Sequence, residues 1–386
     1  MDQLSPEISE RVSQWLSGDY DQETKNAIQR LVDQNDWKEL TDAFYRDLEF
    51  GTGGLRGIMG PGTNRINRYT LGMATQGLSN YLQKVYPDTE IKVAIAHDNR
   101  NNASVFAQVV ADVFSANGIH VYFFDGLRPT PELSFAIRDL GCHSGVMLTA
   151  SHNPKEYSGY KAYWNDGGQV IDPHDRRIIE EVNAIRGIED VRFEGRRELI
   201  STIGEEIDGQ YVAALTNVSL QPEIIRKESD LSIVFSPIHG AAVKLLPQTL
   251  RAFGFTNVTL VEEQCTTDGD FPTVVYPNPE EKEALTLALE KAREIDADLV
   301  LATDPDADRV GIAVKNDRGE FILLNGNQTG CLLIHYVLDQ WEKQERLTGN
   351  EYICKTIVTS YLMDRIAEAK GVDCYNVLTG FKYIGA

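Results

Sequence analysis

From about residue 70 onward, short apolar segments alternate with segments in which apolar residues recur at helical spacing. The first expected helices span residues 71–85, 103–117 and 131–140, and the strands that follow them span 91–96, 120–124 and 144–148. Short strands that alternate with helices of about 10–15 residues are typical of a mostly parallel sheet with helical crossovers. This alternation therefore predicts a fold of the α/β class.

The alternation starts again twice along the chain. It resumes after the acidic, polar stretch 185–208 with expected strands at 231–235, 257–261 and 298–302, and once more with an expected helix at 326–343. A chain of 386 residues is also too long for one ordinary core. We therefore predict successive α/β/α domains with mixed, mostly parallel sheets, the third of them incomplete. The predicted parts are an N-terminal helical extension (1–40), domain I (41–195), domain II (205–315) and a partial domain III (320–386).

The composition argues against several classes of protein. The net charge is −21 and no basic block occurs, which argues against nucleic acid as a partner. The same charge repels an anionic substrate, so a phosphate site has to gather Arg and Lys locally. The five cysteines are scattered without Cys-x-x-Cys spacing, as expected of reduced thiols in a cytoplasmic protein. We find neither a signal-peptide pattern nor an apolar run of roughly 20 residues, and therefore expect no membrane partner and a cytoplasmic location.

Three aspartates, Asp304, Asp306 and Asp308, alternate in a segment that follows an expected strand and ends in Arg309. Carboxylates that converge in a tight loop repel one another unless a cation lies between them. Oxygen ligands at this density suit Mg²⁺. The alternative is a solvated acidic turn, which is the usual fate of a charge cluster. A phosphatase of the haloacid dehalogenase type fits less well, because Asp308 stands where that motif carries Thr or Val.

A hydroxyl group follows another apolar strand. Ser151 lies in Thr149-Ala-Ser-His-Asn-Pro154, directly after the expected strand 144–148. A small-residue turn after a buried strand can expose a nucleophile and leave the following amides free for an anion. The alternative is an ordinary helix N-cap or turn former. A phosphorylated Ser151 would carry nearly two negative charges and complete the ligands of a metal, so the serine and the aspartates together predict metal-dependent phosphoryl chemistry.

Two further segments offer cations for a phosphate. Phe50–Gly57 is expected to be a Gly-rich turn whose amides and Arg56 approach a phosphate, although it matches neither a P-loop nor a dinucleotide fingerprint. Arg100 follows an expected strand, and the carboxyl ends of strands are where α/β sheets place ligands. Its alternative is a surface salt bridge. His239 is either near the site or a packed loop histidine, and Asp268–Asp270 is interpreted as a structured turn rather than a second metal site.

On these residues the chain resembles the α-D-phosphohexomutases, a family of phosphoglucomutases and phosphomannomutases. The resembling segments occur in family order and are Gly51–Gly57, His97–Arg100, Thr149–Pro154, Gly159–Lys161, Ser236–Gly240, Phe271–Glu280, Asp304–Arg309 and Thr379–Ile384. The helical extension and Thr52-Gly-Gly resemble the longer phosphoglucomutase and phosphopentomutase branch.

The resemblance implies a mechanism and site residues. Phosphorylated Ser151 donates to a sugar 1- or 6-phosphate, and the resulting hexose 1,6-bisphosphate reorients before its other phosphate returns to the serine. Mg²⁺ is implied to bind Asp304, Asp306, Asp308 and a phosphoryl oxygen on Ser151. The residues implied to surround the transferred group are Arg56, His152, Lys161 and Arg309. Lys382 matches a substrate-contact region, and Arg100 joins it as a candidate substrate contact because of its place after a strand.

The family pattern continues with a Gly-Glu-x-Ser loop that grips sugar hydroxyls and a fourth domain whose Arg-x-Ser-Gly-Thr loop holds the second phosphate. Neither motif occurs in this sequence, so we expect a fragment of a longer mutase. The expected reaction interconverts hexose 1-phosphate and hexose 6-phosphate, with glucose as the sugar. The alternatives are mannose or pentose phosphate specificity, a Ser151-dependent phosphatase and a non-catalytic sugar-phosphate-binding fragment. The sequence carries no indication of the oligomeric state.

Overall fold

The computed structural model describes residues 3–51 and 53–385, and these residues group into two units. The first unit comprises the residues up to 128 together with 133–204, and the second comprises 129–132 together with the residues from 205 onward. Residues 129–132 therefore belong by their contacts to the unit that is otherwise built from the later part of the chain. Thr52, which is part of the Gly-rich family segment, lies outside the described residues.

Within the described residues, the first unit is built on a six-stranded sheet with the order β1-β5-β4-β2-β3-β6. Its strands are β1 (Gly54–Ile58), β2 (Lys92–His97), β3 (His120–Phe124), β4 (Ser144–Leu148), β5 (Tyr157–Trp164) and β6 (Ile200–Ile203). β2 pairs in parallel with β3 and β4, and β3 with β6, whereas β5 is antiparallel to β1 and β4. The predicted α/β class with a mixed, mostly parallel sheet is confirmed.

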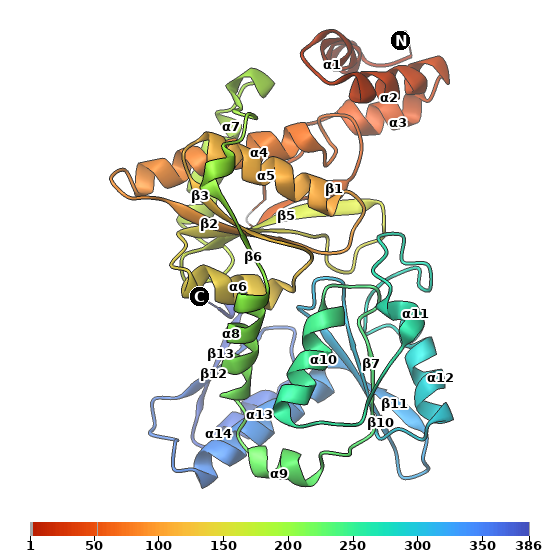
Figure 1. Ribbon diagram of the computed structural model, residues 1–386, viewed down its shortest axis with the longest axis vertical. Helices are drawn as coiled ribbons and strands as arrows, with labels where there is room; N and C mark the ends of the chain where they lie inside the picture. Colours follow the sequence, from red (N-terminus) through yellow and green to blue (C-terminus); the bar gives the residue numbers. More distant parts are fainter. Residues whose placement is uncertain (1–2, 52, 386) are drawn as a thin grey trace. The chain divides into compact units, whose positions relative to one another are not determined.

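Helices cover both faces of this sheet, with α4 and α5 on one side and α6 on the other (Figure 1). The helices of the unit are α4 (Arg68–Val85), α5 (Ala103–Ala116), α6 (Thr130–Asp139), most of which belongs here, and α7 (His174–Asn183), with 3₁₀ turns η1 (Ile188–Asp190) and η2 (Arg197–Leu199). Strand β4 is buried along its whole length, as expected for an apolar run covered on both faces. Val93, Val146, Leu78 and Phe114 lie in the main core between sheet and helices.

Amphipathic helices precede the first sheet and belong to the first unit. They are α1 (Pro6–Ser17), α2 (Gln22–Asp33) and α3 (Trp37–Phe44). Each begins with an N-cap, because the side chains of Ser5, Asp21 and Asp36 accept a hydrogen bond from a backbone N–H of the first turn. Their apolar faces meet around Trp15, which stacks on Tyr20 at a ring-centroid distance of 4.2 Å. The predicted N-terminal extension is confirmed as helical.

The second unit contains, in the described part of the chain, a five-stranded sheet with the order β11-β10-β9-β7-β8. Its elements are α8 (Glu205–Thr216), α9 (Pro222–Lys227), β7 (Ile233–Ser236), α10 (Ala242–Phe253), β8 (Val258–Leu260), α11 (Glu262–Cys265), α12 (Thr286–Glu294), β9 (Leu299–Thr303), β10 (Val310–Lys315) and β11 (Phe321–Leu324). β8 and β9 are parallel to β7, whereas β10 is antiparallel to β9 and β11. The turn between β9 and β10 carries the three aspartates.

The second unit continues with α13 (Gly326–Lys343), β12 (Tyr352–Thr356), α14 (Leu362–Ala369), β13 (Asp373–Val377) and the 3₁₀ turn η3 (Phe381–Tyr383). β12 and β13 pair in parallel. Leu338, Ala367 and Val372 form a small core between these helices and strands. The predicted helix 326–343 is confirmed residue for residue, whereas the predicted domain boundaries stay predictions.

Within the first sheet, strands β1, β5 and β6 are absent from the sequence prediction. β6 lies inside the polar stretch 185–208, which we interpreted as a break between domains, yet its four residues pair with β3 and extend the first sheet. Four residues among charged neighbours give too weak a pattern to predict a strand. β1 contains glycines, which are depleted in strands.

All five cysteines are free, and burial raises the pKa of Cys142 to about 12 and that of Cys265 to about 11. These two thiols therefore stay protonated and unreactive near neutral pH. Among the helices of residues 3–51 and 53–385, none combines the length and the apolar character that crossing a bilayer requires.

Candidate active site

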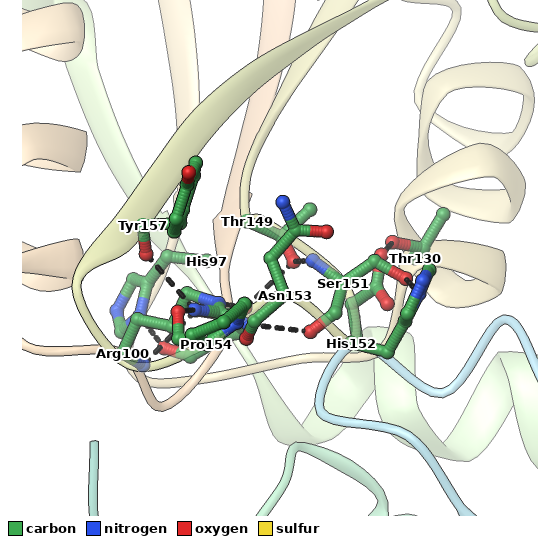
Figure 2. Close-up of polar contacts among 11 residues, drawn as sticks. His97, Arg100, Thr130, Thr149, Ser151, His152, Asn153, Pro154 and Tyr157 are labelled. Carbon is green, nitrogen blue, oxygen red and sulfur yellow. Dashed lines mark hydrogen bonds and ion pairs between the residues drawn. The ribbon is translucent and has the colours of Figure 1, made fainter. Parts of the chain in front are cut away.

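Ser151 lies in the loop after β4, at the edge of the sheet where the parallel strands β2 and β4 end (Figure 2). Its backbone N–H donates to Thr149 Oγ1 at 2.8 Å, and its Oγ lies 3.2 Å from Nδ1 of His152. Its φ of +53° lies in the left-handed region, which residues other than glycine rarely adopt. The residue is 3% exposed, so it is more enclosed than the turn pattern suggests. The loop thus holds the hydroxyl beside an imidazole that can exchange a proton with it.

Arg100 has an environment that differs from the predicted substrate contact. Its terminal nitrogens donate to backbone carbonyls of the serine loop: Nη2 to Ser151 and Asn153 at 2.6 Å each, and Nη1 to Pro154 at 2.8 Å and Tyr157 at 2.9 Å. Nε lies 3.3 Å from Oδ2 of Asp98, and both side chains of this pair are 0% exposed. The alternative of a surface salt bridge is wrong, because neither side chain reaches the surface. A contact with substrate stays a prediction that these distances do not support.

The prediction of a Gly-rich phosphate turn over Phe50–Gly57 is corrected in its second half, because Gly54–Gly57 belong to strand β1. β1 pairs with β5 so that Gly54 faces Lys161 and Arg56 faces Gly159. Opposite residues of an antiparallel pair share a face of the sheet, so Arg56 and Lys161 leave the same face as diagonal neighbours. Gly54 serves strand pairing, because a Cβ there would lie 1.7 Å from the carbonyl oxygen of Tyr160. What remains of the predicted phosphate contact is the exposed side chain of Arg56.

The face that carries Arg56 and Lys161 has the local positive charge that a phosphate site needs in a chain of net charge −21. Tyr160, between them in the register, points to the opposite face because side chains alternate along a strand. Burial raises the pKa of its phenol far above the ordinary value. The phenol therefore stays neutral near pH 7, in the core on the other face of the sheet.

The loop between β9 and β10 brings the predicted metal ligands together in the second unit. One oxygen from each of Asp304, Asp306 and Asp308 lies within 4.8 Å of the other two. Asp304 and Asp306 are 0% exposed, whereas Asp308 is exposed. The N–H of Arg309 donates to Oδ1 of Asp304 at 3.1 Å, and Thr130 Oγ1 donates to Oδ2 of Asp306 at 2.9 Å. Carboxylates at this spacing repel one another, so the donor set fits a hard divalent cation.

Other candidate residues lie elsewhere in the second unit. His239 is fully buried, and its ring nitrogens lie 2.7 and 2.9 Å from oxygen partners in the neighbouring segments, so it is the packed loop histidine of the two alternatives. The N–H of Asp270 donates to Oδ1 of Asp268 at 2.8 Å, as in a structured turn. Lys382 lies in η3 with Nζ 4.8 Å from the ring centroid of Tyr383, and its contact with substrate stays a prediction.

Each unit therefore holds one part of the predicted site. Asp98, Thr149 and Thr130 are not among the predicted site residues, although each one contacts a residue that is. Asp98 could have been found from the spacing Asp98-x-Arg100 after a strand, because this arrangement allows its carboxylate to pair with the guanidinium of Arg100. Thr130 carries no such signal, since it is 176 positions away from Asp306 in sequence.

Three consecutive regions of the chain match models of one family. Residues 47–188 match the phosphoglucomutase/phosphomannomutase alpha/beta/alpha domain I, residues 209–319 match domain II, and residues 325–386 match domain III. The matches follow one another in order and cover most of the chain.

Relatives and a solved structure agree with these matches. A phosphopentomutase of Homo sapiens is 35% identical over 395 residues, which is 98% of this chain. A phosphoglucomutase of Staphylococcus haemolyticus is 36% identical over 345 residues, which is 88% of this chain. The chain spans 64% and 61% of the lengths of these two relatives. A candidate phosphomannomutase from Thermus thermophilus has a crystal structure that is 26% identical, with a TM-score of 0.70 over 88% of this chain and 71% of its own. The chain belongs to the α-D-phosphohexomutase family.

Proposed function

We propose that this chain is the part of a phosphohexomutase that carries the reactive serine and the metal loop. The whole protein then interconverts hexose 1-phosphate and hexose 6-phosphate, with glucose as the sugar. The observation that carries the proposal is the placement of Ser151. Its hydroxyl oxygen lies 3.2 Å from an imidazole nitrogen of His152, and both its backbone N–H and its backbone C=O are hydrogen-bonded to side chains. Membership of the family supports the same reaction.

In the proposed reaction, Ser151 stores a phosphoryl group. When the phosphorylated serine donates this group, the P–Oγ bond breaks and a new P–O bond forms to a free hydroxyl of the sugar monophosphate. The proton of that hydroxyl is transferred to Oγ, and Nδ1 of His152 is close enough to relay it. The hexose 1,6-bisphosphate then reorients, and its other phosphate returns to Ser151 by the reverse steps.

Charged side chains are proposed to stabilise the transferred group. Arg56, Lys161 and Arg309 would surround the phosphoryl oxygens, and Lys382 would contact the sugar phosphate. Mg²⁺ would be held by Asp304, Asp306 and Asp308, whose oxygen-only donor set fits it, and when bound it supplies positive charge that offsets the phosphoryl oxygens.

A pentose phosphate is the second candidate substrate. The human relative that matches 98% of this chain at 35% identity is a phosphopentomutase, which favours a pentose 1-phosphate and 5-phosphate pair. The same serine chemistry serves both sugars, because the reaction needs a phosphate and a free hydroxyl rather than a ring size. Competition between the two monophosphates for phosphorylated Ser151 decides between them.

We also propose a cytoplasmic location for the protein. All five cysteines are free, which fits a compartment that keeps thiols reduced. Fractionation of cells that produce the protein at natural levels tests this location.

Transfer to the serine can be tested on the chain as it is. After incubation with Mg²⁺ and glucose 1,6-bisphosphate, intact mass should increase by one phosphoryl group, and peptide mapping should place this group on Ser151. Ser151→Ala should abolish the increase, because the accepting oxygen is missing. Ser144→Ala, at the other end of β4, is the matched control and should still be phosphorylated.

The acceptor separates mutase chemistry from its alternatives. Glucose 1-phosphate or glucose 6-phosphate should remove the label from Ser151 and become the bisphosphate. Steady release of inorganic phosphate without transfer to sugar would favour the phosphatase. Binding of sugar phosphates without any phosphorylated serine would favour the non-catalytic alternative, and equal labelling of Ser151→Ala and the unchanged chain would contradict the proposal.

A further inference from the structure

Arg100 is a buried cation whose hydrogen bonds are directed at one short stretch of backbone (Figure 2). Its two terminal nitrogens carry four N–H groups, and the carbonyls of Ser151, Asn153, Pro154 and Tyr157 accept from them at 2.6–2.9 Å. Burying a charge is costly unless it is paired and hydrogen-bonded. Here the charge is balanced by Asp98 at 3.3 Å, and the hydrogen bonds of the terminal nitrogens connect the cation to the serine loop.

Asp98 extends the same network to the other side of Ser151. It accepts from the N–H of Arg100 at 3.0 Å and from Oγ1 of Thr149 at 2.6 Å. Thr149 Oγ1 in turn accepts from the N–H of Ser151 at 2.8 Å. Both backbone polar groups of Ser151 are therefore held by one ion pair, the N–H through Thr149 and the C=O through Arg100.

Ser151 needs such support because of its backbone conformation. A φ of +53° is unfavourable for a serine, and residues in sparsely populated regions keep their conformation only when the surrounding structure imposes it. The direction of the Cα–Cβ bond, and with it the range of positions open to Oγ, follows from this conformation. A loop released from the network would relax toward common φ values and move the hydroxyl.

We propose that Arg100, paired with Asp98, is a positioning residue that holds Ser151 in its left-handed conformation so that Oγ meets the phosphoryl group in one fixed place, an inference that rests on the proposed function of Ser151. Arg100 touches neither substrate nor phosphate in this role. The loop is set before the substrate arrives, so no ordering of the backbone has to accompany transfer.

Arg100→Lys is the variant that tests the role, because it keeps the charge opposite Asp98 but loses the planar fork that reaches four carbonyls. Thr149→Val is the second variant, since it leaves Arg100 in place but removes the hydroxyl that joins the N–H of Ser151 to Asp98. Arg65→Lys is the matched control: Arg65 is a buried arginine of the same unit, 2.7 Å from both Glu39 and Asp42 and remote in sequence from the serine loop.

The first measurement is hydrogen exchange of the backbone amides between residues 151 and 157, at a temperature at which all variants are folded. Exchange should be faster in Arg100→Lys and Thr149→Val and unchanged in Arg65→Lys. The second is the single-turnover rate of phosphorylation of Ser151 by glucose 1,6-bisphosphate. This rate should fall on the order of 100-fold in Arg100→Lys at saturating bisphosphate, because small misplacements of a reacting group have effects of this size. The concentration needed for half-saturation should stay nearly constant.

The outcomes separate this role from general stabilisation and from the proposed function. Loss of thermal stability with unchanged loop exchange and an unchanged phosphorylation rate would show a purely structural arginine and overturn the role. Unchanged exchange in both loop variants would overturn it as well. A third outcome is that exchange is faster in the loop variants but the unchanged chain never takes up a phosphoryl group. This outcome would support the role of Arg100 in holding the loop and contradict the function proposed for Ser151.

Discussion

Asp306 is fully buried although it lies in a loop, and its orientation depends on a residue far away in the sequence. Thr130 Oγ1 donates to its Oδ2 at 2.9 Å, and the N–H of Thr130 donates to its carbonyl oxygen at 2.8 Å. A partner of this kind fixes the direction in which a carboxylate presents its other oxygen to a metal. Asp304 is oriented in a similar way by the N–H of Arg309.

Removal of one carboxylate should weaken Mg²⁺ binding and relieve repulsion at the same time. We expect Asp306→Asn to lower the affinity for Mg²⁺ by at least about tenfold, measured by isothermal titration calorimetry. Without metal the variant should be at least as stable as the unchanged chain, because fewer like charges lie together. At the same Mg²⁺ concentration the melting temperature of the unchanged chain should rise more than that of the variant, because the unchanged chain binds the ion more tightly.

Asp270→Asn is the control for this prediction, because it removes a carboxylate from a different acidic turn, Asp268–Pro272. It should leave the affinity for Mg²⁺ as it is. Equal affinities in Asp306→Asn and the unchanged chain would exclude the loop 304–308 as the metal site.

Side-chain chemistry is visible in a sequence, and backbone acceptors are not. Ser151 and the three aspartates could be proposed because each follows an apolar strand in a recognisable pattern. The role of Arg100 could not, since its partners are carbonyl oxygens that every residue possesses. Their convergence on one guanidinium depends on the path of the loop, and the residue types at 151–157 do not indicate this path.

At the level of helices and strands, apolar runs were predicted well and glycine-containing segments poorly. β3 and β4 agree with the expected strands to the residue, because both combine apolar and aromatic side chains in short runs. β1 was predicted as a turn, since glycines favour turns when nothing else is known. Its pairing with β5 decides the outcome, and Gly54 with φ +127° is needed for the close approach of the two strands.

Glycine also permits close packing of helices, and this leads to a prediction for α4 and α7. A Cβ on Gly77 would lie 2.6 Å from Cα of Val182. Since backbone atoms of α7 cannot move aside cheaply, Gly77→Ala should lower the free energy of unfolding by about 1–3 kcal/mol. Urea denaturation monitored by circular dichroism measures the change.

Gly209→Ala is the matched control in α8. No atom from another part of the chain lies within 4 Å of a Cβ placed there, so the alanine should stabilise the chain by about 0.5–1 kcal/mol through its better helix propensity. A stabilising Gly77→Ala would show that α4 and α7 can move apart without cost.

Considered as a whole, the chain has separate cores in its two units. Leu78 belongs to the main core of the first unit and Leu285 to the core around β7 and β9 in the second, and both are fully buried. Units with their own cores can unfold in separate transitions. The length of the chain and the repeated alternation of expected helices and strands indicated more than one domain. The boundaries at 40, 195 and 315 remain predictions.

Calorimetry should assign one transition to each unit. Leu78→Ala should lower the melting temperature of one transition, and Leu285→Ala that of the other, because each substitution costs about 2–5 kcal/mol in its own core. For units of this size the shift should be at least about 4 °C. A single transition that both substitutions shift equally would show that the units unfold together.

Residues 129–132 group with the second unit although their neighbours in sequence group with the first. This assignment could not be predicted, because four residues carry no sequence pattern that indicates it. It has a consequence for the order in which the protein is made. During translation Thr130 is synthesised 176 residues before Asp306. Its side chain therefore lacks this acceptor until the loop 304–308 of the second unit has been synthesised. Expression of residues 205–386 alone would therefore yield an acidic loop that lacks both hydrogen bonds from Thr130.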